Sequence, residues 1–590
     1  MNILFGWHNP EQAPADSESL ARQLGERFGK GNYLDILRQG SYLIAGTGQQ
    51  PASEASARHI GAPTGHLPGY REAGDGQALS RAGGQFSWAA TDGSGLLVAT
   101  DRFASFTIFY YRTAGTLLFS SDLHLLLAHP AAAGLKISAQ ALFDYLFFAV
   151  VPGHLCAYQG IEKLAPGCLL QHTAERVSTH RYWLPDFSHQ ERRPIPELET
   201  EVVQALGSAV ARAASLDQPG CFLSGGLDSS SVCGLAARHL GPGVPAITIG
   251  FDEADFDESE YAAIAARQYG LDWHNETISA DDIQSRIDEV VAGYAEPFGN
   301  SSAVSALICA QIAKQQGISN LLAGDGGDEL FGGNDRYQKQ MLFGYYERVP
   351  GMLRKALLDP FAGAAGKPGW GPIAKLGNYV RQAQVPLPDR LFSYNLLARN
   401  APDKVLTPEF LAQVDVASPY QYARSVYNTP DDADTLDRML FLDWTLTLAD
   451  NDLPKVRGTC NIAGVEVHFP MLDAAVVDLS TAVPSRDKLD LRALRRFYKQ
   501  AFREILPAEI LTKPKHGFGV PVGLWFEKSP ALGDRLHGAL QSLRSRGVVR
   551  AEFIDELLRL QRTEHAVYYG ALNWTLFMLE EWLSHYRLSL

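Results

Sequence analysis

The first 130 residues carry short apolar runs, alternating with polar positions, that predict β-strands. Residues 83–90 alternate and are followed by Asp92-Gly93, a dipeptide typical of tight turns, after which 96–100 is again apolar. A further hairpin is predicted from 107–111 and 117–120. This part of the chain is therefore predicted to be rich in antiparallel β-structure.

From about residue 219 the pattern changes to apolar runs that alternate with helical periodicity. Strands are predicted at 219–223, 246–250, 273–278 and 318–323, and helices at 197–214, 259–269 and 281–294. Strands that alternate with helices of this length predict a parallel, doubly wound sheet. Residues from 334 onward carry few strand signals and predict helices, ending in an amphipathic helix at 571–582.

A charged, proline-bearing stretch at 191–196 separates the two patterns. A chain of 590 residues is also long enough for two or more domains. We therefore predict an α/β protein (α+β overall) with two domains. The first, residues 1–190, is an antiparallel sandwich, and the second, residues 196–590, is a doubly wound parallel sheet with extra helices.

Composition narrows the class of protein. A formal net charge of −14 argues against a surface that binds nucleic-acid phosphates. The six cysteines are scattered without metal-site spacing, which indicates buried, reduced thiols of a cytosolic protein. The N-terminus lacks the basic and apolar regions of a signal peptide, and no apolar stretch is long enough to span a membrane. We expect a cytoplasmic protein without nucleic-acid or membrane partners.

The serine–glycine loop, residues 224–231, follows an apolar run and precedes a helical pattern. Its residues are Ser-Gly-Gly-Leu-Asp-Ser-Ser-Ser. Serine and glycine let the backbone approach an anion closely, and the helix that follows adds the positive end of its dipole. A carboxylate, Asp228, lies within this phosphate cradle and calls for a cation such as Mg²⁺, which binds carboxylate and phosphate oxygens together. Taken alone, a serine-rich turn at a helix start is the alternative.

The acidic loop, residues 324–333, makes that alternative less attractive. It follows another apolar strand and reads Gly-Asp-Gly-Gly-Asp-Glu-Leu-Phe-Gly-Gly. Three acids within five residues repel one another, so we expect the loop to hold a cation. Loops at the carboxyl ends of parallel strands face the crevice where open α/β sheets bind ligands.

The pair of loops resembles the synthetase domain of the asparagine synthetase family, which belongs to the pyrophosphate-releasing ATP ligases. The resemblance implies that a substrate carboxylate attacks the α-phosphate of ATP and that an amine then displaces AMP. It implies that ATP and Mg²⁺ are the cofactors and that Asp228 and Asp328 are the metal ligands. The residues it implies for nucleotide binding are Phe222, Ser224, Gly225, Gly226, Asp228, Ser229, Ser230, Ile249 and Gly324. For Phe222, Ile249 and Gly324, plain strand ends are nearly as good an explanation.

Two further sequence motifs that resemble the family lie in the C-terminal part of the chain, and the resemblance implies catalytic residues in them. Residues 512–521 are similar to a family phrase whose lysine corresponds to Lys515, a charge suited to stabilising the α-phosphate in the transition state. Residues 451–456 through 464–473 resemble another family motif, in which Glu466 takes the place of a glutamate that helps deprotonate the amine. Asp325 completes the predicted catalytic set. His468 and Arg457-Gly458 depart from the family pattern, which leaves the contacts to the substrate carboxylate open.

The N-terminal strands resemble the glutaminase (Ntn-hydrolase-type) domain of the same family, but the chemistry of that domain is not implied here. Its nucleophile is a cysteine directly after the initiator methionine, and this chain has Asn2. The family's glutamine-binding phrases are also missing from residues 1–80. We expect an inactive scaffold, and another nucleophile such as Ser17 is a much weaker alternative.

Without glutamine hydrolysis the amine has to come from ammonia or from a substrate. The leading hypothesis is a lasso-peptide macrolactam synthetase, which acts on a precursor peptide and for which a leader peptidase is a candidate partner. The β-lactam-forming branch of the family has Tyr at the position of Asp325, so the chain departs from it. An ammonia-dependent asparagine-type synthetase, or an amidotransferase acting on another small acid, is the second hypothesis. A non-catalytic binding module of the same fold is the third.

Overall fold

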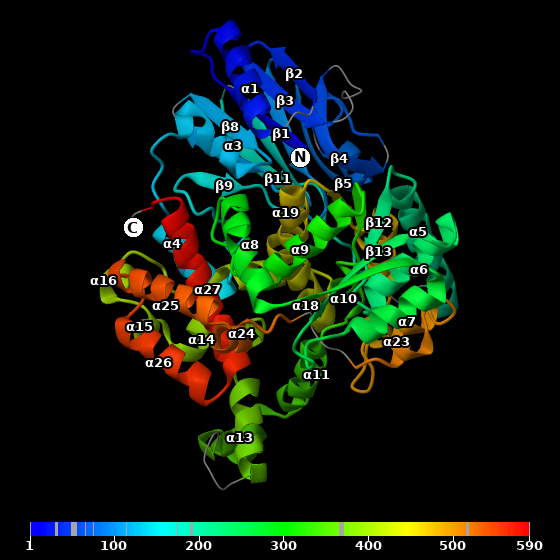
Figure 1. The fold of residues 1–590 in the computed structure, drawn as a ribbon, viewed down its shortest axis with the longest axis vertical. Helices are drawn as coiled ribbons and strands as arrows, with labels where there is room; N and C mark the ends of the chain where they lie inside the picture. The colour runs from blue at the N-terminus through cyan, green and yellow to red at the C-terminus, as the bar shows by residue number, and fades with distance from the viewer. Residues whose placement is uncertain are drawn as a thin grey trace.

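The computed structural model describes residues 2–29, 33–48, 56–64, 66–74, 76–113, 115–173, 175–188, 193–364, 371–514 and 519–588. It has three sheets, two antiparallel and near the N-terminus, and one parallel in the C-terminal part. Figure 1 shows the antiparallel sheets at one end of the molecule and a helix-rich body below them. The predicted fold class is confirmed.

The antiparallel sheets pack face to face as a sandwich. The first sheet has the order β2 (Tyr33–Gln39), β3 (Tyr42–Gly48), β1 (Ile3–His8), β8 (Thr116–Ser120), β7 (Phe109–Thr113) and β9 (Ile161–Lys163). The second has the order β11 (Val177–Arg181), β10 (Cys168–Thr173), β6 (Gly95–Thr100), β5 (Gly83–Thr91) and β4 (Ala57–Thr64). Leu4 and Ile44 of the first share one buried apolar cluster with Leu96 and Val98 of the second. Both hairpins predicted from the alternating pattern are present.

The parallel sheet places the predicted loops. Its order is β14 (Asp272–Ile278), β13 (Pro245–Phe251), β12 (Pro219–Phe222), β15 (Asn320–Leu322) and β16 (Glu466–His468). The chain moves from β12 outward to β14 and then crosses back to β15 on the other side of β12. The strand order therefore reverses between β12 and β15, which is where doubly wound sheets bind ligands.

Helices cover both faces of the parallel sheet, as Figure 1 shows. Those on one side are α5 (Ile195–Ala214), α6 (Leu227–Leu240) and α7 (Ser259–Tyr269), and those on the other are α8 (Ala280–Gly293) and α9 (Ser302–Gln315). Their buried positions recur at helical spacing, for example Leu198, Val202 and Leu206 in α5. Burying that apolar stripe against the sheet is what fixes each helix there.

The body continues mainly as helices, as predicted from residue 334 onward, although strand β16 was not predicted. They include α10 (Gly327–Phe331), α11 (Asp335–Arg348), α13 (Gly371–Ala383), α17 (Ser418–Tyr427), α18 (Thr435–Asp443), α19 (Leu453–Ala463), α20 (Ala474–Ala482), α22 (Arg496–Ala501), α24 (Val522–Lys528), α25 (Pro530–Ser545), α26 (Ala551–Thr563) and α27 (Ala566–His585). A π-helical segment, η5 (Trp444–Asp452), leads directly into α19.

The last helix differs from its prediction. Helix α27 is not amphipathic: from Asn573 to Leu583 every residue except Glu581 is buried. Aromatic and aliphatic side chains occur all around this helix, so it needs packing partners on every side. The buried Glu580 carboxylate accepts hydrogen bonds from Ser542 (2.6 Å) and Arg546 (2.8 Å), which offset the cost of burying it.

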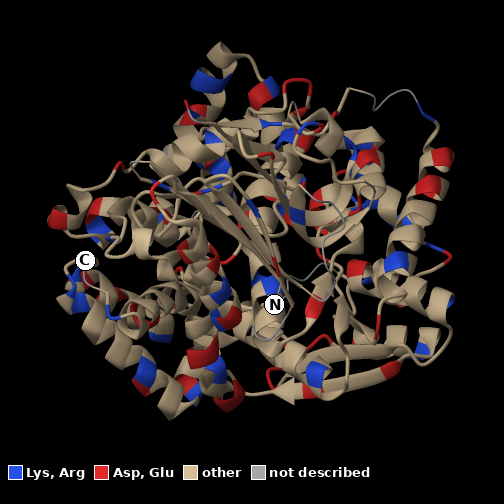
Figure 2. Ribbon diagram, turned by 90° about the horizontal axis from the view of Figure 1, so that it is seen from above, with Lys and Arg blue, Asp and Glu red and all other residues tan. Residues whose placement is uncertain are grey.

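Three further features of the described residues concern membrane helices, charge and cysteines. No helix in the described part of the chain combines the length and apolar character needed to cross a bilayer. Basic and acidic residues are interspersed in the view of Figure 2. All six cysteines are free and buried, as predicted.

Candidate active site

The serine–glycine loop connects β12 to the 14-residue helix α6. The Ser229 hydroxyl accepts a hydrogen bond from the Ser224 N–H (3.2 Å), and the two hydroxyls lie 3.0 Å apart. Gly225 has φ +69°, and a Cβ there would meet the Cβ of Tyr261 at 2.7 Å, so only glycine fits against α7. The loop is thus held closed at a helix N-terminus, a position that favours anions.

The structure brings the acidic loop against the serine–glycine loop. Because β12 and β15 are adjacent and parallel, their carboxyl ends meet at one edge of the sheet. A Cβ on Gly324 would lie 2.7 Å from the Ser229 nitrogen and 2.9 Å from the Asp228 carbonyl carbon. The two backbones therefore touch at Gly324, which explains why this position is glycine.

Asp228 and Asp328, the predicted metal ligands, converge on one cation, the guanidinium of Arg495. Arg495 Nη1 donates to Asp228 Oδ2 (2.6 Å) and to Asp328 Oδ1 (3.0 Å), while Nη2 contacts the other Asp228 oxygen. Burial disfavours the charged guanidinium, but the two carboxylates raise the pKa of Arg495 above its ordinary value. Two facing carboxylates are a donor set that suits Mg²⁺, so the residues fit the predicted metal.

A lysine lies against each loop. Lys513 Nζ donates to the Gly225 carbonyl (3.3 Å), forms an ion pair with Glu258 (3.1 Å) and lies over the Tyr261 ring. Lys455, near the start of α19, forms an ion pair with Asp452 (2.7 Å). Both lysines add positive charge near the loops, and the Lys455 charge acts on Asp325 of the acidic loop.

The Asp325 carboxyl group has a pKa above that of an ordinary aspartate. Burial raises the pKa of Asp325 to about 6; Lys455 opposes this shift, and the carboxylates of Asp452 and Asp228 add to it. A carboxyl group with a pKa near neutrality is suited to proton transfer, and such shifts gather at functional sites.

Glu466 lies apart from the two loops. It opens β16 opposite Asn320, the first residue of β15, whereas the acidic loop follows Leu322 at the end of that strand. Two residues along a strand correspond to about 7 Å. The Glu466 charge instead acts on the buried Arg457. The catalytic role of Glu466 stays a prediction.

Other predicted residues lie where the sequence placed them, with their roles still predictions. Phe222 ends β12, and Ile249 lies in β13 two residues after the partner of Phe222. Ser230 is fully buried, and its hydroxyl finds no hydrogen-bond partner among the described residues. Lys515 falls outside the described residues.

His468, which replaces a family arginine, cannot supply the same charge. Burial and the nearby Arg457 lower the pKa of His468 to about 4. Its Nε2 hydrogen-bonds with Asn320 Oδ1 (2.9 Å). The imidazole is therefore neutral at physiological pH and is engaged within the sheet.

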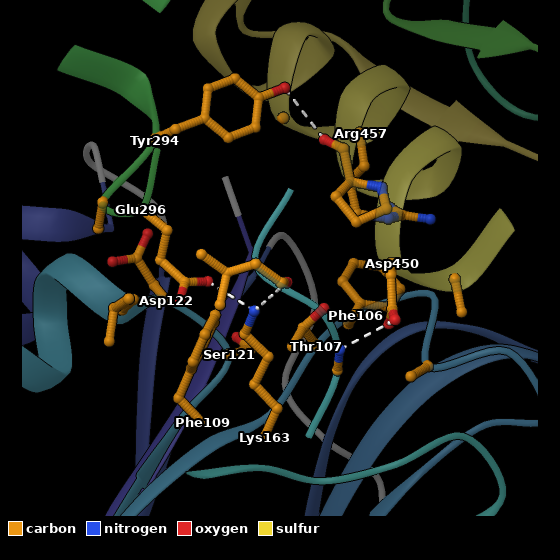
Figure 3. A pocket seen from close by; sticks show the side chains of 18 of the residues that line it. Phe106, Thr107, Phe109, Ser121, Asp122, Lys163, Tyr294, Glu296, Asp450 and Arg457 are labelled. Atoms are coloured by element: carbon orange, nitrogen blue, oxygen red, sulfur yellow. Dashed lines mark hydrogen bonds and ion pairs between the residues drawn. The ribbon is translucent and has the colours of Figure 1, made fainter. Parts of the chain in front are cut away.

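The N-terminal domain meets the body at a cavity of about 200 Å³, whose lining includes Asn2. Figure 3 shows Lys163 and Glu296, paired at 2.7 Å, facing each other across the domain boundary. Asp450, on the far wall, accepts a hydrogen bond from the Gly153 N–H (2.9 Å). Ser17, the weaker nucleophile candidate, is buried and accepts the indole N–H of Trp7 (2.9 Å), which is a structural role.

Sequence reasoning missed Arg495, Lys455 and Lys513 as site residues. Lys455 and Lys513 lie within the sequence motifs that resemble the family. Their positive charge, close to Asp452 and Lys515 in the sequence, could have identified them as site residues. Arg495 lies in an Arg-Arg pair that gives no local cue. Its role depends on contacts with residues 167 and 267 positions away.

Comparison with known proteins identifies the family. The family model for asparagine synthase matches residues 201–584, and that for the glutamine amidotransferase domain matches residues 67–183. The chain is 27% identical to a putative glutamine-hydrolyzing asparagine synthetase of Mycobacterium tuberculosis, over 79% of this chain and 71% of that protein. It is 24% identical to asparagine synthetase 1 (glutamine-hydrolyzing) of Bacillus subtilis, over 82% and 74%.

Among solved structures, glutamine phosphoribosylpyrophosphate amidotransferase from B. subtilis matches 41% of this chain and 65% of its own, at 12% identity and a TM-score of 0.22. A TM-score this low carries no argument about fold or function. The family model spans well over half of the chain and includes both loops, Lys455, Arg495 and Lys513. The chain therefore belongs to the asparagine synthase family and is an ATP-dependent carbon–nitrogen ligase of the asparagine synthetase type.

Proposed function

We propose that this ligase adenylates a side-chain carboxylate of a peptide and closes a macrolactam with that peptide's N-terminal amine. The observation that carries the proposal is that Asp228 and Asp328 of the two synthetase loops converge, while Asn2 stands in place of the glutaminase nucleophile. An enzyme that cannot release ammonia from glutamine needs an amine from elsewhere, and a substrate amine meets that need.

The chain's own residues supply most of the chemistry. The serine–glycine loop and the start of α6 would bind the pyrophosphate part of ATP, with Lys513 beside Gly225 offsetting its charge. Asp228 and Asp328 would hold Mg²⁺, which neutralises charge on the phosphates when bound. Asp325, with its pKa raised by burial to about 6, would accept the proton that the attacking amine must lose.

The test is direct. The full chain is incubated with ATP, Mg²⁺ and a leader-free core peptide taken from a short open reading frame beside the gene. We expect release of AMP and pyrophosphate and a product lighter than the peptide by one water. An Asp228→Asn variant should release no AMP. A peptide of unchanged mass, with wild-type enzyme that binds ATP, would reject macrolactam formation.

The second candidate is an ammonia-dependent asparagine-type synthetase, and the names of the relatives favour it. It predicts exchange of pyrophosphate into ATP with aspartate alone, and asparagine when ammonium is added. Macrolactam formation predicts exchange only with the peptide. An Asn2→Cys variant should not release glutamate from glutamine, since the family's glutamine-binding phrases are missing from residues 1–80.

A further inference from the structure

The position between Asp228 and Asp328 is taken by a buried side chain that the mechanism above does not use. The Arg495 side chain is 3% exposed, against 19% for Asp228 and 23% for Asp328. Its guanidinium touches both carboxylates. The place to which a metal ion would bind is therefore filled by protein.

Arg495 is held there by its surroundings. It has a left-handed backbone (φ 55°), uncommon for a residue with a side chain, directly before α22. Its guanidinium lies 4.2 Å from the centre of the buried Tyr498 ring. A strained backbone at a functional position persists only where the surrounding contacts over-determine it, and here they include two ion pairs and an aromatic face.

One nitrogen of Arg495 has no hydrogen-bond partner among the described residues. This nitrogen is Nε, and it is buried. Buried donors are usually paired, and a ligand oxygen that enters the site would give this one an acceptor. The serine–glycine loop, where a phosphate is proposed to bind, begins four residues before Asp228, which Arg495 contacts. A phosphate oxygen is the acceptor that arginine's fork of donors suits best.

A guanidinium and a divalent metal ion cannot share the space between the two carboxylates, because the cations would repel each other at contact distance. If metal bound alone, it would displace the Arg495 guanidinium, and no other anion would be there to pair with that guanidinium. Metal that arrives with a triphosphate brings anionic oxygens that the guanidinium can move to. The exchange then keeps every charge paired.

We propose that Arg495 is a positioning residue that occupies the cation site between Asp228 and Asp328 in the free enzyme and moves to a phosphate oxygen when metal and nucleotide bind together. Divalent metal is then taken up only with nucleotide. This inference rests on the proposed ligase site, but it concerns binding and does not require that any particular amide is formed.

The experiment follows bound Mn²⁺ by electron paramagnetic resonance on the full chain, with and without a non-hydrolysable ATP analogue. Wild type should bind Mn²⁺ at least tenfold more weakly alone than with the analogue. Arg495→Met should bind Mn²⁺ alone at least tenfold more tightly than wild type. Arg496→Met is the matched control, because Arg496 is half exposed and pairs with Asp487 outside the crevice; it should behave as wild type.

Thermal melting tests whether the variants are folded. Arg495→Met should melt below wild type without ligand, and Mn²⁺ alone should restore much of the loss, whereas wild type should not respond to Mn²⁺ alone. Arg495→Lys, which keeps one charge, should give an intermediate Mn²⁺ affinity. Equal Mn²⁺ affinity of wild type and Arg495→Met, or loss of Mn²⁺ binding by Arg495→Met both with and without nucleotide, would overturn the inference.

The outcome is separable from that of the proposed function. If the Mn²⁺ results hold but no amide product forms with any peptide, the inference stands and macrolactam formation falls. If product forms while Arg495→Met binds Mn²⁺ as wild type does, the function stands and Arg495 is only a structural counter-ion.

Discussion

Replacing Gly324 by alanine tests whether contact between the two loops sets the geometry of the site. A Cβ at this position would lie 2.7 Å from the Ser229 nitrogen, whereas ordinary contacts begin at 3.4 Å. Both neighbours are backbone, so neither can rotate away, and the loops must separate by about 0.7 Å. Gly324 has no positive φ, so backbone conformation does not oppose alanine and the effect is steric.

This movement would increase the distance between Asp228 and the acidic loop. A displacement near 1 Å in a catalytic site can cost about 100-fold in rate. We expect Gly324→Ala to lower kcat/KM for pyrophosphate exchange by roughly 30- to 100-fold, and to destabilise the fold by about 1–3 kcal/mol, the usual cost of overpacking. Stopped assays with labelled pyrophosphate measure the first, and denaturant titration measures the second.

Gly344→Ala is the matched control, because its added Cβ meets no atom within 4 Å and it lies within helix α11. Alanine there should leave activity unchanged and should stabilise the helix by up to about 1 kcal/mol. Activity of Gly324→Ala equal to that of Gly344→Ala would refute the argument that the loop contact sets the site.

Three further predictions follow from buried charges. Lys455→Met removes a charge that lowers the pKa of Asp325, so the acid limb of the pH–rate profile should move to higher pH; an unmoved limb would show that Asp325 does not titrate in the assay. Burial raises the pKa of Asp450 from 3.8 to about 7, so the folded protein holds a proton that the unfolded chain releases, and stability falls as pH rises through that window. Asp450→Asn should therefore be more stable than wild type at pH 8, by up to a few kcal/mol at about 1.4 kcal/mol per pKa unit, and equal to it at about pH 4 in chemical denaturation. Lys488 and Asp437 form an ion pair of 2.8 Å with side chains 1% and 0% exposed, so Lys488→Met should cost about 3–5 kcal/mol; adding Asp437→Asn should recover part of that loss, and no recovery would speak against the pair as its cause.

Much of the architecture was present in local sequence. The hairpins at 83–100 and 109–120 follow from alternation around short turns, and the parallel strands from apolar runs before glycine-rich loops. The two loops were recognisable because a phosphate cradle and a cation site need consecutive residues of particular types. Adjacent strands then bring the loops together, and the sequence predicted this from strand–helix alternation.

Helix α27 shows where local pattern fails. Periodicity predicts one apolar face, but the helix is buried on nearly all sides because the rest of the body packs around it. The position of Glu466 also depends on tertiary structure. Its phrase matches the family, yet its place at the start of β16 depends on the register with β15.

The sequence by itself determined which backbone segments form the serine–glycine loop and the acidic loop, because those features depend on neighbours within a few residues. Only the tertiary structure decided which charges face them. Arg495 meets Asp228 across 267 residues and Asp328 across 167, and Lys513 reaches Gly225 across 288. Coulomb energy depends on distance in space and on burial, and neither is fixed until the helices after β15 fold back over the carboxyl ends of the strands.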